Sequence, residues 1–184
     1  MKLLFLAAVD FELDAALRAC ARSDAGSDAV FVTGGVGAAA TREALERAFR
    51  SGIPFDRVVN VGVAGSGTPL LPVGAVAHVV SERHGDREGS LLRNPAPWPE
   101  LGFLPQATGR TLQELDDRWR REPADIESME GAAFFECCLR QGVPFAEIRA
   151  VSNQVGERDH ARWDIPLALK NLQTALETFL NVLK

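Results

Sequence analysis

Cysteine is scarce in this sequence, and its few cysteines lack the number and spacing of a covalent or metal framework. They are Cys20, Cys137 and Cys138, and the last two are neighbours inside an apolar run. An odd count argues against a set of structural disulfides, and the lack of a Cys-x-x-Cys pair removes the usual signal of a zinc site. The cysteine content therefore favours a reducing, cytoplasmic location.

Long apolar runs and blocks of basic residues are also missing. No stretch of about 18 consecutive apolar residues occurs, so a membrane-spanning helix is not expected. The short apolar run at residues 3–9 leads directly into Asp10 and Glu12 without the cleavage-like site of a signal peptide, so it is interpreted as a buried strand. The 25 acidic and 20 basic residues give a net charge of −5 with no Lys/Arg cluster, which argues against nucleic acid as a partner.

The sequence does contain a regular alternation of short apolar runs and amphipathic stretches. With 184 residues, 46% hydrophobic and 24% charged, it has the composition of a folded globular chain, and we expect one domain over residues 1–184. The alternation predicts an α/β sandwich with a mixed or mostly parallel sheet, in which ligands bind at the carboxyl ends of strands. The predicted strands are residues 3–9, 29–33, 57–61, 74–81 and 145–151; the predicted helices are residues 11–21, 38–50, 111–120, 129–141 and 165–183; residues 82–105 are predicted to be a loop.

Two glycine clusters follow predicted strands. Residues 34–37 (Gly-Gly-Val-Gly) match a dinucleotide fingerprint only loosely, because the sixth position lacks glycine, so a tight strand-to-helix turn is the better interpretation. Residues 62–67 (Gly-Val-Ala-Gly-Ser-Gly) lack the Lys-Ser/Thr of a phosphate-binding loop. Their small side chains would let a flat ligand approach the backbone closely.

Three glutamates lie at predicted element ends. Glu12 begins a helix, where a carboxylate is favoured by the helix dipole even without a functional role. Glu127 and Glu130 precede an apolar helix and can be interpreted as capping residues. Glu130 runs directly into that buried helix, however, and a buried carboxylate needs paired donors, of which vicinal ribose hydroxyls are one example.

The strand predicted at residues 145–151 carries two further candidates. Arg149 lies between apolar neighbours, and because buried arginines are rare, we expect it to pair with a carboxylate or a bound water. Asn153 follows the strand, where it could cap a turn or use its donor and acceptor to bind a heterocycle.

Taken in order, these motifs resemble the nucleoside phosphorylase/nucleosidase superfamily, and in particular its futalosine hydrolase family. The resemblance implies a three-layer α/β/α sandwich with a mixed central sheet, and it covers most of the chain apart from residues 80–105. The stretches that carry it are residues 127–135 (Glu-Ser-Met-Glu-Gly-Ala-Ala-Phe-Phe), 142–145, 148–153 and 155–159, with Trp163, together with residues 1–12, 35–37, 60–65 and 107–109.

The resemblance implies a catalytic role for three residues. Glu12 matches the carboxylate that activates the hydrolytic water, and Arg149 matches the arginine that helps to hold this water. Asn153 stands where adenine-specific nucleosidases carry an aspartate that protonates N7. An amide at this position suits a 6-oxopurine such as hypoxanthine, so Asn153 is expected to stabilise the leaving base.

The resemblance also implies how the substrate is bound and what the reaction is. Met129 and Glu130 match the pair that grips the ribose, and Ala64 and Gly65 match small residues beside the base and sugar. The expected reaction is hydrolysis of the N-glycosidic bond of futalosine in menaquinone biosynthesis, releasing hypoxanthine and dehypoxanthine futalosine. The expected partner is a small purine nucleoside, and the chemistry requires neither a metal nor an organic cofactor.

The alternatives are a methylthioadenosine/S-adenosylhomocysteine nucleosidase, which Asn153 disfavours, and a catalytically silent purine-nucleoside-binding protein. The family's serine near the water is Val63 here. A phosphorylase would need basic groups around the first glycine turn, and only Arg42, well into the next helix, is near it. Relatives pair through neighbouring elements, and the helix at 129–141 is apolar almost all round, so a homodimer or larger homo-oligomer is expected.

Overall fold

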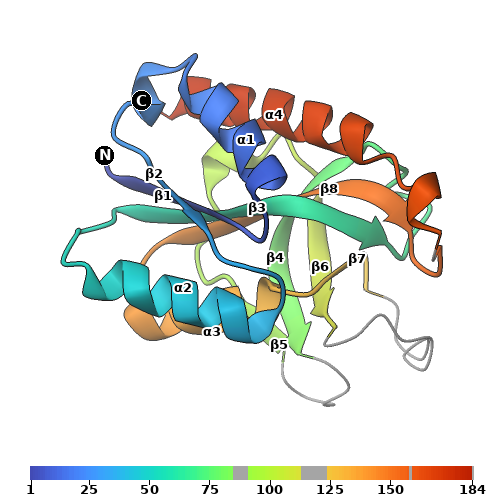
Figure 1. Cartoon of the computed structure of the whole chain (residues 1–184), viewed down its shortest axis with the longest axis horizontal. Helices are drawn as coiled ribbons and strands as arrows, with labels where there is room; N and C mark the ends of the chain where they lie inside the picture. Colours follow the sequence, from blue (N-terminus) through green and yellow to red (C-terminus); the bar gives the residue numbers. More distant parts are fainter. Residues whose placement is uncertain (85–90, 113–123, 158, 184) are drawn as a thin grey trace.

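The computed structural model describes residues 1–84, 91–112, 124–157 and 159–183, and in this part of the chain eight strands form one mixed sheet (Figure 1). The strand order is β2-β1-β3-β7-β6-β4-β5, and β8 pairs with both β3 and β4. These pairings close a ring of β3, β8, β4, β6 and β7, so the ends of distant strands lie around one space. The strands are β1 (Leu3–Ala7), β2 (Val30–Thr33), β3 (Arg57–Ser66), β4 (Val76–His84), β5 (Leu91–Arg93), β6 (Gln106–Thr111), β7 (Ile126–Ser128) and β8 (Phe145–Gln154).

Helices cover the sheet on both faces, which confirms the three-layer sandwich. Helices α1 (Asp10–Cys20) and α4 (Ile165–Val182) lie on one face, and α2 (Ala38–Arg50) and α3 (Gly131–Gln141) lie on the other (Figure 1). The continuous apolar run of β1 follows from this layering, because successive strand residues point to opposite faces and both faces are buried. Leu3 and Phe5 enter the core under α1 and α4, whereas Leu4 and Leu6 enter the core under α2 and α3.

Several predicted element boundaries between residues 62 and 128 were wrong. The glycine-rich segment 62–67 is mostly strand, because β3 continues to Ser66. Within the predicted loop 82–105, β4 extends to His84 and β5 follows; β6 and β7 were missed entirely. Thr111, the first residue of the helix predicted at 111–120, ends β6, and residues 113–120 lie outside the described part of the chain. These strands carry buried polar side chains such as Glu82 and Arg110, so they lack the apolar pattern that marks the other strands.

Helix α3 is buried within this chain. It begins at Gly131, two residues later than predicted, and its side chains Phe134 and Phe135 contact Phe145 edge to face, with ring centroids 4.9–5.5 Å apart. Cys137 and Cys138 are also buried and free. The apolar character of this helix is therefore explained by packing against the sheet and α2, and it gives no ground for expecting a second subunit.

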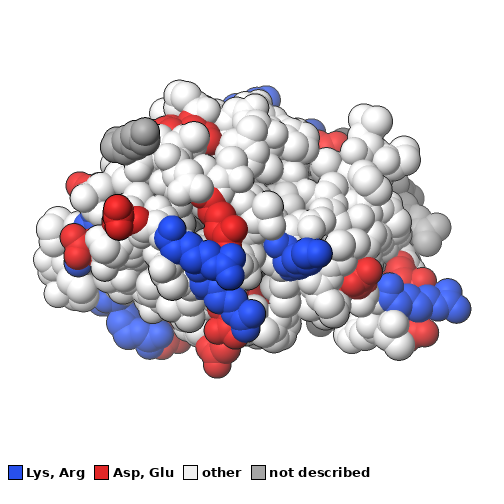
Figure 2. All heavy atoms as spheres, turned by 90° about the horizontal axis from the view of Figure 1, so that it is seen from above, with Lys and Arg blue, Asp and Glu red and all other residues white. Residues whose placement is uncertain are grey.

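One face of the molecule mixes both signs of charge. Figure 2 shows lysine and arginine side chains interspersed with aspartate and glutamate on the face seen there, between broad uncharged areas. None of the helices in the described ranges is long and apolar enough to cross a membrane.

Candidate active site

A cavity of about 800 Å³ opens where the carboxyl ends of β3, β6, β7 and β8 meet the start of α1. This is the position at which open α/β sheets bind ligands, and the volume is that of a small-molecule site. The cavity is lined by six of the seven residues to which the family resemblance assigns a role, namely Glu12, Ala64, Gly65, Met129, Glu130 and Asn153. The seventh, Arg149, lies behind the wall of the cavity.

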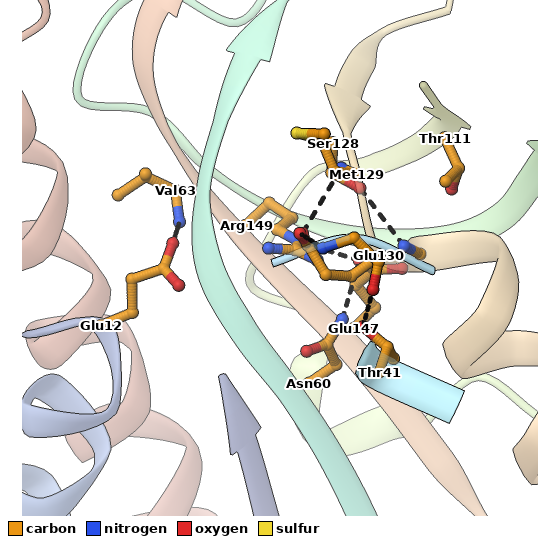
Figure 3. A network of polar contacts seen from close by, with 12 residues as sticks. Glu12, Thr41, Asn60, Val63, Thr111, Ser128, Met129, Glu130, Glu147 and Arg149 are labelled. Carbon is orange, nitrogen blue, oxygen red and sulfur yellow. Dashed lines mark hydrogen bonds and ion pairs between the residues drawn. The ribbon is translucent and has the colours of Figure 1, made fainter. Parts of the chain in front are cut away.

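Glu12 is a buried carboxylate held at the cavity by backbone donors. Its Oε1 accepts a hydrogen bond from the Val63 N–H at 2.8 Å (Figure 3). Its Oε2 accepts a longer one from the Val9 N–H at 3.4 Å. Burial raises the pKa of Glu12, against the lowering effects of Arg149 and the Val63 N–H. Gly62 makes room for this arrangement, because a Cβ there would lie 2.8 Å from Glu12 Oε1. The bond to Val63 shows that Glu12 does more than begin a helix.

Glu130 is the second buried carboxylate of the cavity. Its Oε1 accepts from the Gly37 N–H at 3.0 Å, and its Oε2 contacts the Met129 N–H at 3.4 Å and Arg149 Nη2 at 3.3 Å (Figure 3). Gly37 has φ +92°, a conformation that favours glycine, so the turn at residues 34–37 serves to bring its N–H to Glu130. With one described partner, Oε1 can accept a further hydrogen bond from a ligand hydroxyl.

Arg149 supplies the positive charge beneath these carboxylates. Its side chain is 1% exposed, its Nε lies 2.8 Å from Glu147 Oε1, and its Nη2 reaches Glu130. The prediction that a buried arginine would pair with a carboxylate is thus confirmed, with two partners. The surrounding carboxylates raise the pKa of Arg149 despite its burial, so it stays charged. It acts on the cavity through Glu130 and the field it exerts on Glu12.

Two further buried glutamates were missed by sequence reasoning. Glu147 accepts from Asn60 Nδ2 at 3.1 Å in addition to Arg149, and Glu82 accepts from Thr111 Oγ1 at 2.9 Å. Among the described residues, Glu82 Oε1 and Glu147 Oε2 have no hydrogen-bond partner. Burial and mutual repulsion raise the pKa of Glu82, and burial raises that of Glu147.

Glycines create the space that these two carboxyl groups share. A Cβ at Gly131 would lie 2.5 Å from Glu82 Cδ and 3.0 Å from Glu147 Oε2, so both carboxyl groups converge on that glycine. The sequence contained a signal for Glu147, since a charged residue inside the strand predicted at 145–151, as in Glu-Ile-Arg at 147–149, is unusual enough to demand a partner. Glu82 lay in the segment predicted to be a loop, so it carried no such signal.

Asn153 lies at the other end of the cavity, next to the last residue of β8. Its Oδ1 accepts from Ser152 Oγ at 2.8 Å and its Nδ2 donates to the Gln154 carbonyl at 3.1 Å, which fixes the amide orientation and leaves one N–H for a ligand. Nδ2 lies 3.3 Å from the position that a Cβ on Gly65 would occupy. Gly65 thus leaves open the space next to this donor.

The cavity also has an aromatic wall that the sequence analysis did not identify. His160 and Trp163 both line it, with ring centroids 4.3 Å apart. The Trp163 indole N–H donates to the Glu157 carbonyl at 3.1 Å, which orients the ring. Flat apolar surfaces of this kind suit an aromatic ligand. The described residues contain no group of three His, Cys, Asp or Glu side chains placed to hold a metal ion.

The sequence of this chain is similar to those of known proteins. Residues 102–184 match the model of the Phosphorylase superfamily. The chain is 32% identical over 161 residues to a futalosine hydrolase of Streptomyces coelicolor, an alignment that covers 72% of this chain and 68% of that protein. It is 35% identical over 119 residues to a futalosine hydrolase of Thermus thermophilus, covering 60% of this chain and 53%, about half, of that protein.

Solved structures share the fold along the whole chain. The native futalosine hydrolase of Helicobacter pylori superposes with a TM-score of 0.81 at 15% identity, covering 98% of this chain and 97% of that chain. The 5'-methylthioadenosine/S-adenosylhomocysteine nucleosidase of S. pneumoniae, solved with a transition-state inhibitor, superposes with a TM-score of 0.82 at 17% identity and covers both chains fully. The chain therefore belongs to the futalosine hydrolase family, hydrolases of N-glycosidic bonds within the phosphorylase superfamily.

Proposed function

We propose that the protein hydrolyses the N-glycosidic bond of futalosine, releasing hypoxanthine and dehypoxanthine futalosine in menaquinone biosynthesis. The observation that carries this proposal is the division of one cavity between two buried carboxylates, Glu12 and Glu130, and an uncharged amide donor, Asn153. Cleavage passes through a sugar with oxocarbenium character, so the site needs negative charge at the ribose and a donor at the departing base.

Each of these residues has a contact that suits its proposed step. Glu12 takes a proton from a water that attacks C1′; its raised pKa makes it a stronger base than an exposed carboxylate, and Val63 holds its other oxygen. Glu130 accepts from the ribose hydroxyls, while Arg149 and Gly37 keep its carboxylate in place. The remaining N–H of Asn153 donates to N7 or O6 of the purine and so stabilises the leaving group.

Water, not phosphate, is the proposed nucleophile. Phosphorolysis would require cationic phosphate ligands around the turn at residues 34–37. Arg42, the basic residue that follows this turn, forms an ion pair with Glu136 at 3.1 Å and does not line the cavity. We therefore expect hypoxanthine to be released equally well with and without inorganic phosphate, and formation of ribose 1-phosphate products would contradict a hydrolase.

The direct test is product analysis after incubation with futalosine, inosine and methylthioadenosine. We expect hypoxanthine from futalosine, and Glu12→Gln should lower kcat by about 10²–10⁴-fold while substrate binding is kept, because an amide cannot accept the proton of water. Asp14→Asn, a change of an exposed carboxylate on the same helix, is the matched control and should leave kcat unchanged.

The same assay separates the other candidate functions. Proteins named 5'-methylthioadenosine/S-adenosylhomocysteine nucleosidase, such as that of Shewanella oneidensis, are 24% identical over 188 residues, covering 85% of this chain and 79% of that protein. A higher kcat/KM for methylthioadenosine than for futalosine would assign that activity instead. Binding of a nucleoside without release of any base would indicate a silent binding protein.

A further inference from the structure

A row of four paired residues crosses the floor of the cavity on adjacent strands. Arg110 of β6 pairs with Glu127 of β7, Glu127 pairs with Gly65 of β3, and Gly65 pairs with Asn153 of β8. Directly paired residues of neighbouring strands project their side chains on the same side of the sheet, and all four residues line the cavity. Glu127 is therefore a cavity residue. It is not part of a helix cap, because α3 begins only at Gly131.

The row has a gap in its middle. Gly65 has no side chain, so Glu127 and Asn153 face each other across it from strands that lie two strand spacings, about 10 Å, apart. Asn153 Nδ2 lies 3.3 Å from the place of the missing Cβ. A planar base above Gly65 would thus have an amide donor at one edge and a carboxylate at the next.

The hydrogen-bonding order of these groups distinguishes two kinds of purine. A 6-oxopurine presents acceptors at N7 and O6 and then a donor at N1–H, whereas adenine presents an acceptor at N7, a donor at the 6-amino group and an acceptor at N1. With N7 or O6 at the Asn153 N–H, the N1 position points toward Glu127. The ionised carboxylate accepts only, so it pairs with N1–H and opposes the N1 lone pair of adenine.

We propose that Glu127 is a specificity-determining residue that accepts the N1–H of a 6-oxopurine opposite Asn153, with the Arg110 guanidinium beside it. The proposal rests on the proposed function, in that a purine occupies this cavity. It adds a second contact that selects hypoxanthine over adenine. Burial raises the pKa of Glu127 while Arg110 lowers it, so the guanidinium favours the ionised, accepting form.

Calorimetric binding of the free bases tests this contact without depending on turnover. The wild-type protein should bind hypoxanthine at least 10-fold more tightly than 1-methylhypoxanthine, which lacks the N1–H. Glu127→Ala should weaken hypoxanthine binding by about 10–100-fold and bring the two bases level, because it removes the acceptor and makes room for the methyl group. Glu127→Gln keeps an acceptor oxygen and should restore most of the preference. Glu43→Ala on the exposed face of α2 is the matched control.

The outcomes separate the two proposals. If the wild type binds hypoxanthine but binds 1-methylhypoxanthine equally well, or if Glu127→Ala changes neither, the role of Glu127 is refuted and the proposed function stands. If the wild type binds no purine and cleaves no purine nucleoside, the proposed function fails and this inference fails with it. Thermal unfolding of each variant shows whether a loss of binding reflects a loss of fold.

Discussion

Arg149 neutralises a group of buried carboxylates, so its replacement should destabilise the protein strongly. Its guanidinium is 1% exposed and forms ion pairs with Glu147 at 2.8 Å and Glu130 at 3.3 Å, and its charge also acts on Glu12. Arg149→Met keeps much of the side-chain volume but leaves these carboxylates without their cation. Breaking a buried ion pair by removing one partner costs about 3–5 kcal/mol. For a chain of this size, that corresponds to a melting temperature lower by roughly 6–20 °C.

The loss should depend on pH with a definite sign. Arg149 lowers the pKa of Glu147 and Glu12, so its removal raises both further above their ordinary value. The native variant then binds more protons than its unfolded state, and its stability falls as pH rises. The destabilisation should therefore be larger at pH 8 than at pH 5.5, where these carboxyl groups can become neutral.

The measurement is urea and thermal unfolding of wild type and variant at both pH values. Arg50→Met is the control, because the Arg50 side chain is 70% exposed and lies 3.5 Å from Glu46, and a surface pair of this kind contributes less than about 1 kcal/mol. An Arg149→Met protein within 1 kcal/mol of the wild type at both pH values would refute the idea that Arg149 neutralises a buried acidic group.

Three further predictions follow from the site. Glu82→Gln should match the wild type at low pH and become relatively more stable as pH rises above the ordinary carboxyl pKa of 4.5. The reason is that the pKa of Glu82 is raised, so the folded protein favours the neutral carboxyl group and ionisation costs stability. Unfolding free energies from about pH 5 to about pH 9 test this, and a relative loss of stability at high pH would contradict it. Asn153→Asp removes both amide donors and places a carboxylate against the Gln154 carbonyl. The ratio of kcat/KM for a 6-oxopurine nucleoside over a 6-aminopurine nucleoside should therefore fall at least about 10-fold. An unchanged ratio would show that Asn153 does not contact the base. We expect at least a dimer, since Phe11 and Val36 at the cavity rim are 48% and 57% exposed; a strict monomer in sedimentation at micromolar concentration would be the contrary result.

Much of the architecture could be predicted from local patterns. Helix α2 runs over Ala38–Arg50 as predicted, and β1, β2, α1 and α4 agree within about two residues at each end. These elements bury apolar faces, and burial leaves a periodic record in the sequence. Among the strands that were missed or cut short, β4 to β7 bury charged and polar side chains and leave no such record.

The candidate site shows the same division. Along the chain, Arg149 stood out as an arginine within an apolar strand. The roles of Glu12 and Asn153 came from the family resemblance, because a carboxylate at a helix start and an amide at a strand end also have ordinary structural explanations. Their partners come from positions far away in the sequence: Glu12 is separated from Val63 by 51 residues, and Gly37 from Glu130 by 93. No local pattern predicts such a pairing.

Residue type and spacing thus determined the layers, the helices and the kind of chemistry that the chain can carry. The tertiary structure decided which side chains share a space. It placed Arg149 behind the cavity, brought Glu82 and Glu147 together at Gly131, and moved Glu127 from an expected helix cap to the cavity floor. The physical reason is strand register: the pairing of β3 with β7 and β8 aligns residues that are up to about 90 positions apart, and only the closed ring of strands determines that alignment.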